Sequence, residues 1–185
     1  FKLTDDIYLN DISNYADWAT EAPANNWTPI GNSNRKFAGN FDGDGHTIYG
    51  MYCCSTDGTN IGLFGAIRSA TIKNTTLKYA YIAHDATTVG DVYLGGIVGQ
   101  VFTDNTSITP VHIEDCGFSG SIAAENGKQV GGLIGRAAVS SSDYPTNIYM
   151  HKYLEPVYET YKGWNTDISK AKSMDEFINL CTSKR

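Results

Sequence analysis

The chain has little charge and no concentration of positive charge. Charged residues make up 18% of its 185 residues, the formal net charge is −6, and the 14 lysines and arginines are scattered along the sequence. Proteins that follow a phosphate backbone gather lysine and arginine on one surface. We therefore expect no nucleic-acid partner.

Long apolar runs are missing as well. No stretch approaches the roughly 18 to 20 apolar residues that cross a membrane as a helix. Phe1 starts directly in patterned sequence, without the charged and apolar regions of a signal peptide. We predict that this segment does not insert into a membrane, and that any signal peptide has already been removed.

Cysteine is scarce and irregularly spaced. The chain has four cysteines: Cys53, Cys54, Cys116 and Cys181. Such spacing does not suit a disulfide framework, and the sequence has no Cys-x-x-Cys or His-x-x-x-His pair to bind zinc. We expect buried structural thiols, and a bridge from Cys53 or Cys54 to a distant cysteine stays open.

Known catalytic patterns are also absent: there is no Gly-x-Ser-x-Gly elbow, phosphate loop or His-Glu-x-x-His helix. The most enzyme-like string is 42–46, Asp-Gly-Asp-Gly-His. A calcium loop needs about six oxygen ligands, and the next glutamate downstream is Glu114. We interpret the string as a turn whose aspartates accept backbone N–H groups, with His46 structural, and predict no catalytic residue, metal or cofactor.

Glycine and tyrosine are abundant, with 19 and 12 residues. One short glycine phrase occurs three times, at 61–65, 95–99 and 131–135, and the glycines at its second position, Gly62, Gly96 and Gly132, lie 34 and 36 residues apart. Each phrase is followed by a β-branched segment, at 71–74, 112–116 and 147–150. Each unit is therefore predicted to form strand, turn and strand.

A unit of this size cannot bury its own apolar face and must stack on its neighbours. We predict a single all-β domain, a short right-handed parallel β-helix (solenoid) of about four coils, with the hand taken from the crossover rule. One glycine of each phrase should take a positive φ, and the missing Cβ atoms should let coils approach to about 4.8 Å. The predicted motif residues are Gly62, Leu63, Gly65, Gly96, Ile97, Gly99, Gly132, Leu133 and Gly135.

The repeats, 61–150, are flanked by distinct segments. The lead-in, 1–52, should supply the first coil or two and a short helix over 13–22 with Ser13 as its N-cap. Inserts at 103–110 and 140–146 are predicted to be protruding loops. Residues 151–185 should form a C-terminal cap with a helix from Met174 to Thr182, because Ser173 to Glu176 forms a capping box. Whether this helix is a cap or the start of another unit stays open.

Aromatic residues crowd the segment after the last repeat. They include Tyr153, Tyr158, Tyr161 and Trp164. Such rings either seal the end of a solenoid or form a ligand platform, because sugar rings and protein partners both pack on aromatic faces. Both interpretations stay open.

The glycine phrases, with Ile113-Glu114-Asp115-Cys116 after the second, resemble the GLUG motif repeat. The lead-in strings Leu-Thr-Asp-Asp-Ile at 3–7 and Trp-Thr-Pro-Ile-Gly at 27–31 resemble the segment that commonly precedes such repeats. The resemblance covers about residues 1 to 150. It departs at Cys53-Cys54, in the third repeat, which lacks the Asn-Cys ending, and over 151–185.

The resemblance implies a bacterial secreted or cell-surface protein, adhesin-like or part of the non-catalytic region of an IgA-specific peptidase. We therefore expect a monomeric, non-enzymatic repeat module for adhesion, interaction or spacing. Its partners would be a host or bacterial surface protein or a glycan. The alternative is a carbohydrate-binding, or less readily a polysaccharide-cleaving, β-helix.

Overall fold

The computed structural model describes residues 1–56, 58–84, 91–102, 111–124 and 129–138. In these ranges the chain forms strands and turns, and its one helical element is a 3-10 turn, η1 (Tyr15–Asp17). The predicted all-β class is confirmed. The expected strand at 147–150, the loops at 103–110 and 140–146, and the C-terminal cap with its helix lie outside the described residues.

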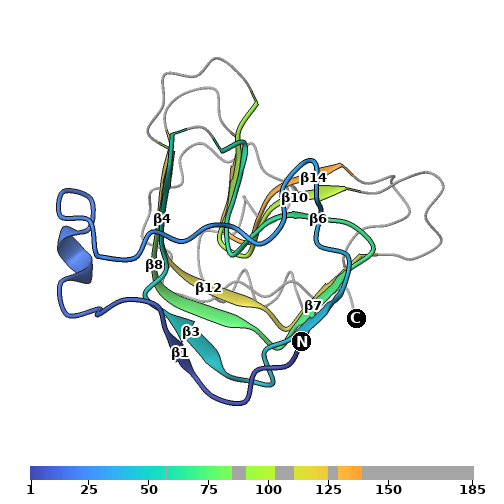
Figure 1. Ribbon diagram of the computed structural model, residues 1–185, viewed down its shortest axis with the longest axis horizontal. Coiled ribbons are helices and arrows are strands. Elements are labelled where there is room, and N and C mark those ends of the chain that lie inside the picture. The colour runs from blue at the N-terminus through green and yellow to red at the C-terminus, as the bar shows by residue number, and fades with distance from the viewer. Residues whose placement is uncertain (57, 85–90, 103–110, 125–128, 139–185) are drawn as a thin grey trace, which may run out of the picture.

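The largest sheet, called the β8 sheet, curls around one side of the molecule (Figure 1). Its strands lie in the order β1 (Ile7–Tyr8), β3 (Thr47–Tyr49), β8 (Thr76–His84) and β12 (Gly117–Ala124), and β4 (Tyr52–Ser55) pairs with the second half of β8. Every pairing is parallel.

Three further parallel sheets have three strands each. The first contains β2 (Asn40–Asp42), β7 (Thr71–Lys73) and β11 (His112–Glu114). The second contains β5 (Asn60–Ile61), β9 (Tyr93–Gly95) and β13 (Gln129–Gly131). The third contains β6 (Phe64–Ile67), β10 (Val98–Phe102) and β14 (Ile134–Ala138).

The chain visits these sheets in a repeating order. Strands β5 to β8 are followed by β9 to β12 in the same sequence of sheets, and β13 and β14 begin the next round. We call each round a repeat. The glycine phrases lie in register, because Val98 pairs with both Phe64 and Ile134. Each repeat therefore covers the apolar edge of the one before it.

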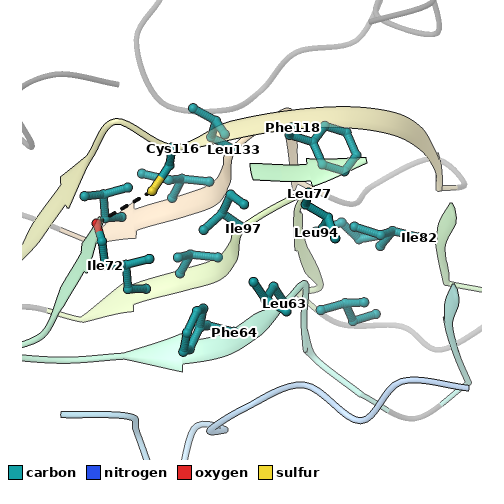
Figure 2. Packing of buried hydrophobic residues seen from close by; sticks show 14 of the residues in the cluster. Leu63, Phe64, Ile72, Leu77, Ile82, Leu94, Ile97, Cys116, Phe118 and Leu133 are labelled. Carbon is teal, nitrogen blue, oxygen red and sulfur yellow. Dashed lines mark hydrogen bonds between the residues drawn. The ribbon is translucent and has the colours of Figure 1, made fainter. Parts of the chain in front are cut away.

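The core lies between the sheets (Figure 2). The apolar residues between the repeat glycines are at most 5% exposed, which confirms their predicted burial. They are Leu63, Phe64, Ile97, Val98, Leu133 and Ile134. In the β8 sheet, buried Ile48, Leu77 and Phe118 alternate with residues that point outward, as the two-residue period of a strand requires.

The repeat glycines are needed for close approach, and the predicted positive φ at them is wrong. Among the glycines of the described ranges, positive φ occurs at Gly31, Gly45 and Gly50 and not in the repeat phrases. A Cβ atom on Gly62 would lie 2.4 Å from the carbonyl oxygen of Gly95 in the next repeat. The backbones there leave no room for a side chain, so the second half of the prediction is confirmed.

The helix predicted over 13–22 is also wrong, because only the turn Tyr15–Asp17 forms. Ser13 is not its N-cap: the Ser13 amide instead donates to Asp11 Oδ1 at 2.9 Å. Isolated short helices are marginal in water. The segment instead directs Trp18 inward, where the residue is 1% exposed.

The described cysteines are free thiols. Cys53 and Cys116 are buried and Cys54 is half-buried, so burial is confirmed for two of the three. Burial raises the pKa of both buried thiols to about 12. The Cys116 thiol donates to the carbonyl oxygen of Glu114 at 3.2 Å and helps close the corner between β11 and β12.

Candidate functional site

Tyrosine side chains gather on the outward face of the β8 sheet. We define the tyrosine surface as Tyr8, Tyr49, Tyr52, Tyr79 and Tyr81. Tyr49, Tyr52 and Tyr81 each lie between two buried residues, so the strand period places them outside. The pairing of β1 with β3 puts Tyr8 beside Tyr49, and the pairing of β4 with β8 puts Tyr52 beside Tyr81.

The rings stack from strand to strand. The ring centroids of Tyr8 and Tyr49 lie 4.7 Å apart with an interplanar angle of 11°, and those of Tyr52 and Tyr81 lie 5.6 Å apart at 9°. Such pairs contribute about 0.5–1.5 kcal/mol beyond the area that they bury. The stacks therefore help to hold successive strands together.

Two rings of this surface remain open to solvent. Tyr8 is 66% exposed and Tyr79 is 45% exposed, and among the described residues the other exposed large hydrophobic side chain is Phe1, at 87%. Stacking between strands therefore leaves part of the ring area of these tyrosines exposed. A partner can reach Tyr8 and Tyr79 directly.

The backbone of Tyr79 is strained. Its φ is +52°, in the left-handed region, which a bulky side chain occupies at a cost of about 1–3 kcal/mol. On the neighbouring strand β12, Ser119 pairs with Lys78 and Gly120 pairs with Ala80. Tyr79 therefore has no partner residue in β12 and forms a bulge. Its ring lies beside that of Tyr49, with the centroids 6.4 Å apart.

A loop over residues 10–25 borders the tyrosine surface. Its ends are tied together, because Asn10 Nδ2 donates to the carbonyl oxygen of Asn25 and the Asn25 amide donates back to Asn10 Oδ1, both at 2.9 Å. A loop of this size with joined ends is an Ω-loop, a kind of loop that often serves function. In Figure 1 it is the blue segment that projects beside β4 and β8.

Two aromatic residues fix the Ω-loop to the sheet. The Tyr15 hydroxyl donates to the carbonyl oxygen of Ala80 at 3.1 Å, and the Tyr15 ring meets that of Tyr79 edge-on at 5.5 Å. Burial raises the pKa of the Tyr15 hydroxyl. Trp18 meets the ring of Tyr52 edge-on at 6.0 Å. The loop thus forms a wall at one side of the exposed Tyr79 ring.

The chemistry of the surface suits binding. The five strands of the β8 sheet contain no aspartate or glutamate. In register with Tyr49 lie Lys78 on β8 and then Ser119 on β12. The face offers aromatic rings, hydroxyl groups and one ammonium group, and its strands lack the paired carboxylates that hydrolyse glycosidic bonds.

The predicted turn at 42–46 is confirmed and lies at another corner. Asp42 Oδ1 accepts hydrogen bonds from the Asp44 amide and from Asn74 Nδ2, both at 2.9 Å. The Asn74 bond is the largest of the effects that lower the pKa of Asp42 to about 2. His46 Nδ1 lies 3.5 Å from Asp6 Oδ1, which joins the turn to the start of the chain.

The other predicted residues do not join the tyrosine surface. The repeat motif residues lie at the corners between sheets and in the core, and Tyr153, Tyr158, Tyr161 and Trp164 lie outside the described residues. Sequence reasoning missed the tyrosine surface. Its available signal was the placement of tyrosines two or three residues apart, at Tyr49 and Tyr52 and again at Tyr79 and Tyr81.

Neither a described protein family nor a solved structure matches the chain. A relative from Evansella cellulosilytica, described as "Putative Gly-rich membrane protein", is 32% identical over 111 residues, which make up 58% of this chain and 12% of that protein. The chain thus corresponds to a small part of a much longer relative.

In the described ranges, no helix is long and apolar enough to cross a membrane. The same ranges contain no group of three or more His, Cys, Asp or Glu side chains that could hold a metal ion.

Proposed function

We propose that the chain is a non-catalytic interaction module of a bacterial secreted or cell-surface protein, and that the tyrosine surface contacts its partner. The observation that carries the proposal is the exposed, strained Tyr79. Unusual backbone conformations persist where the surroundings hold them and concentrate at functional sites. At Tyr79 the strain presents an aromatic ring to solvent.

The proposed architecture of this module is a right-handed parallel β-solenoid of about four coils over residues 1 to 150. Support comes from the parallel pairing of every strand with its counterpart one repeat away and from the right-handed rule for parallel crossovers. For 151–185, a C-terminal cap with a short helix stays a prediction from the sequence.

The surface location is proposed from the resemblance to GLUG repeats. The length of the Evansella relative, of which the match covers 12%, is in keeping with a module inside a large protein. An interaction role is favoured over a spacer role, because a spacer has no use for an exposed aromatic ring at an energetic cost. An enzymatic role gains no support from a face without carboxylates.

Adherence of the purified, fluorescently labelled chain to mucin-coated plates and to washed bacterial cells tests the proposal. We expect the wild-type chain to bind saturably and Tyr79→Gly to bind at least about tenfold more weakly, the loss of one well-packed aromatic contact. Phe1→Ala is the matched control: it removes an exposed ring near Phe37, away from the tyrosine surface. Equal binding of Tyr79→Gly, or no binding by the wild type, would refute the proposal.

A further inference from the structure

We infer that the ligand of the tyrosine surface is a glycan, bound as a chain of pyranose rings along the outward face of the β8 sheet. This inference rests on the proposed function and names the class of partner. It assigns to Tyr8 and Tyr79 the role of stacking platforms, and to the neighbouring hydroxyl and ammonium groups the role of hydrogen-bond partners.

The side chains that are exposed match a sugar better than a protein. No large aliphatic side chain of the described residues is exposed, and the exposed rings on this face are Tyr8 and Tyr79. A stable protein interface buries about 800 Å² on each partner around an apolar core. A pyranose ring instead has one apolar C–H face surrounded by hydroxyl groups, and needs one aromatic ring with polar groups beside it.

Tyr8 offers a free ring face. One face of its ring stacks on Tyr49 at 4.7 Å, and in the described part of the chain no aromatic ring covers the other. The residue is 66% exposed although it belongs to a stacked pair. The ring is therefore held in one orientation before any ligand arrives, which lowers the entropic cost of binding.

Tyr79 offers a second ring that the fold also fixes. Tyr15 meets it edge-on at 5.5 Å and Tyr49 lies beside it at 6.4 Å, yet 45% of the residue is exposed. The Ω-loop bounds this end of the surface. Two fixed rings on one face suit an extended polymer better than a single sugar.

Polar side chains lie on β8 and β12, next to the ring of Tyr79 along the sheet. Lys78 precedes Tyr79 and pairs in register with Tyr49 and Ser119. Ser121 lies on β12 with Ser119, in register with Tyr81, and its Oγ is 3.4 Å from the Tyr15 hydroxyl. Hydroxyl and ammonium groups of this kind bind the hydroxyl groups of a sugar and set the orientation of its ring.

The test measures binding to defined polysaccharides in native gels that contain xylan, mannan, dextran or chondroitin sulfate. We expect at least one of them to retard the wild-type chain. Tyr8→Ala and Tyr79→Gly should each weaken that retardation at least about tenfold, whereas Phe1→Ala leaves it unchanged. Tyr8 is exposed and Tyr79→Gly relieves strain, so both variants should fold, which their circular dichroism and unfolding curves check.

A second arm separates the inference from the proposed function. The mucin-coated plates and bacterial cells are treated either with periodate, which cleaves sugar diols, or with a protease. Loss of adherence after periodate supports the glycan. Adherence that depends on Tyr79, survives periodate and disappears after protease would overturn the glycan while leaving the interaction module intact. Absence of any adherence would remove the proposed function itself.

Discussion

Tyr79 stands in β8 at the place that Gly50 holds one repeat earlier, and both residues have left-handed backbones, with φ of +52° and +73°. The alignment follows from the pairs on either side, Tyr49 with Lys78 and Tyr52 with Tyr81. At Gly50 a Cβ atom would lie 2.8 Å from the carbonyl oxygen of Asn10. The chain thus makes the same bend twice, once with the residue suited to it and once with a strained tyrosine.

Replacing Tyr79 by glycine should therefore change stability little. The substitution relieves the left-handed strain of about 1–3 kcal/mol, and it loses the ring contacts with Tyr15 and Tyr49, which together contribute a similar free energy. We expect the free energy of unfolding in urea to stay within about 1.5 kcal/mol of wild type. Tyr81→Gly, in ordinary strand geometry and stacked on Tyr52, should cost more because it relieves no strain. Equal losses in the two variants would show that Tyr79 carries no strain.

The glycines of the repeat phrases should tolerate no side chain. In Gly99→Ala the new Cβ atom would lie 2.5 Å from the amide nitrogen of Ile61 and 2.7 Å from the carbonyl oxygen of Gly65, both backbone atoms. We expect a loss of about 3 kcal/mol or more, or failure to fold.

Gly45→Ala is the matched control for crowding. Gly45 has a φ of +84°, but a Cβ atom there would have no neighbouring atom within 4 Å, so the substitution should cost about 1 kcal/mol through backbone strain alone. Urea unfolding of both variants tests the pair. A smaller loss in Gly99→Ala than in Gly45→Ala would contradict the close approach of the repeats.

The stacking of repeats could be predicted from the sequence, because apolar pairs such as Leu63-Phe64 recur at nearly constant spacing and need neighbours to bury them. The close approach at the glycines could be predicted too, but their backbone conformation could not, because the expected positive φ does not occur in the repeat phrases. Whether a glycine supplies a positive φ or space depends on how near another backbone comes. At Gly99 that backbone belongs to residues more than thirty positions earlier.

The tyrosine surface could not be predicted from the sequence either, because it too depends on contacts between residues far apart in the chain. Tyr8, Tyr49 and Tyr79 have no constant spacing in the sequence. They meet because parallel pairing puts Tyr8 beside Tyr49 and Tyr49 beside Lys78, and because β8 holds the extra residue Tyr79 opposite Ser119 and Gly120. A one-residue change of register would turn these rings toward the core.

The turn at Asp42 should make the fold sensitive to acid. Its carboxylate accepts two hydrogen bonds and lies 3.3 Å from Lys73 Nζ, and its pKa falls from 3.8 to about 2. Stability from this group is present above pH 4 and is lost as the pH falls through 2. Asp42→Asn keeps an acceptor oxygen but does not titrate. The difference in thermal midpoint between wild type and Asp42→Asn should shrink from pH 6 to pH 2, and a constant difference would contradict the assignment.

The buried thiol of Cys116 should make the fold sensitive to alkali. Burial raises its pKa from 9.0 to about 12, so the folded chain keeps a proton that the unfolded chain releases. Stability should fall between pH 9 and pH 12 by up to about 1.4 kcal/mol per pH unit from this group. The preceding repeat has Thr75 at the equivalent place, and its hydroxyl donates to the carbonyl oxygen of Lys73 at 2.8 Å. Cys116→Ser should therefore fold.

Comparison of that serine variant with the wild type isolates the thiol from the lysines and tyrosines that titrate in the same range. Urea unfolding at pH 8 and pH 10.5 should show a smaller loss of stability in Cys116→Ser than in the wild type. At pH 8 the Cys116 thiol of the folded wild type should also resist a thiol reagent, because almost none of it is thiolate. Equal alkaline losses, or rapid labelling of Cys116 in the folded chain, would show that this corner is open to solvent.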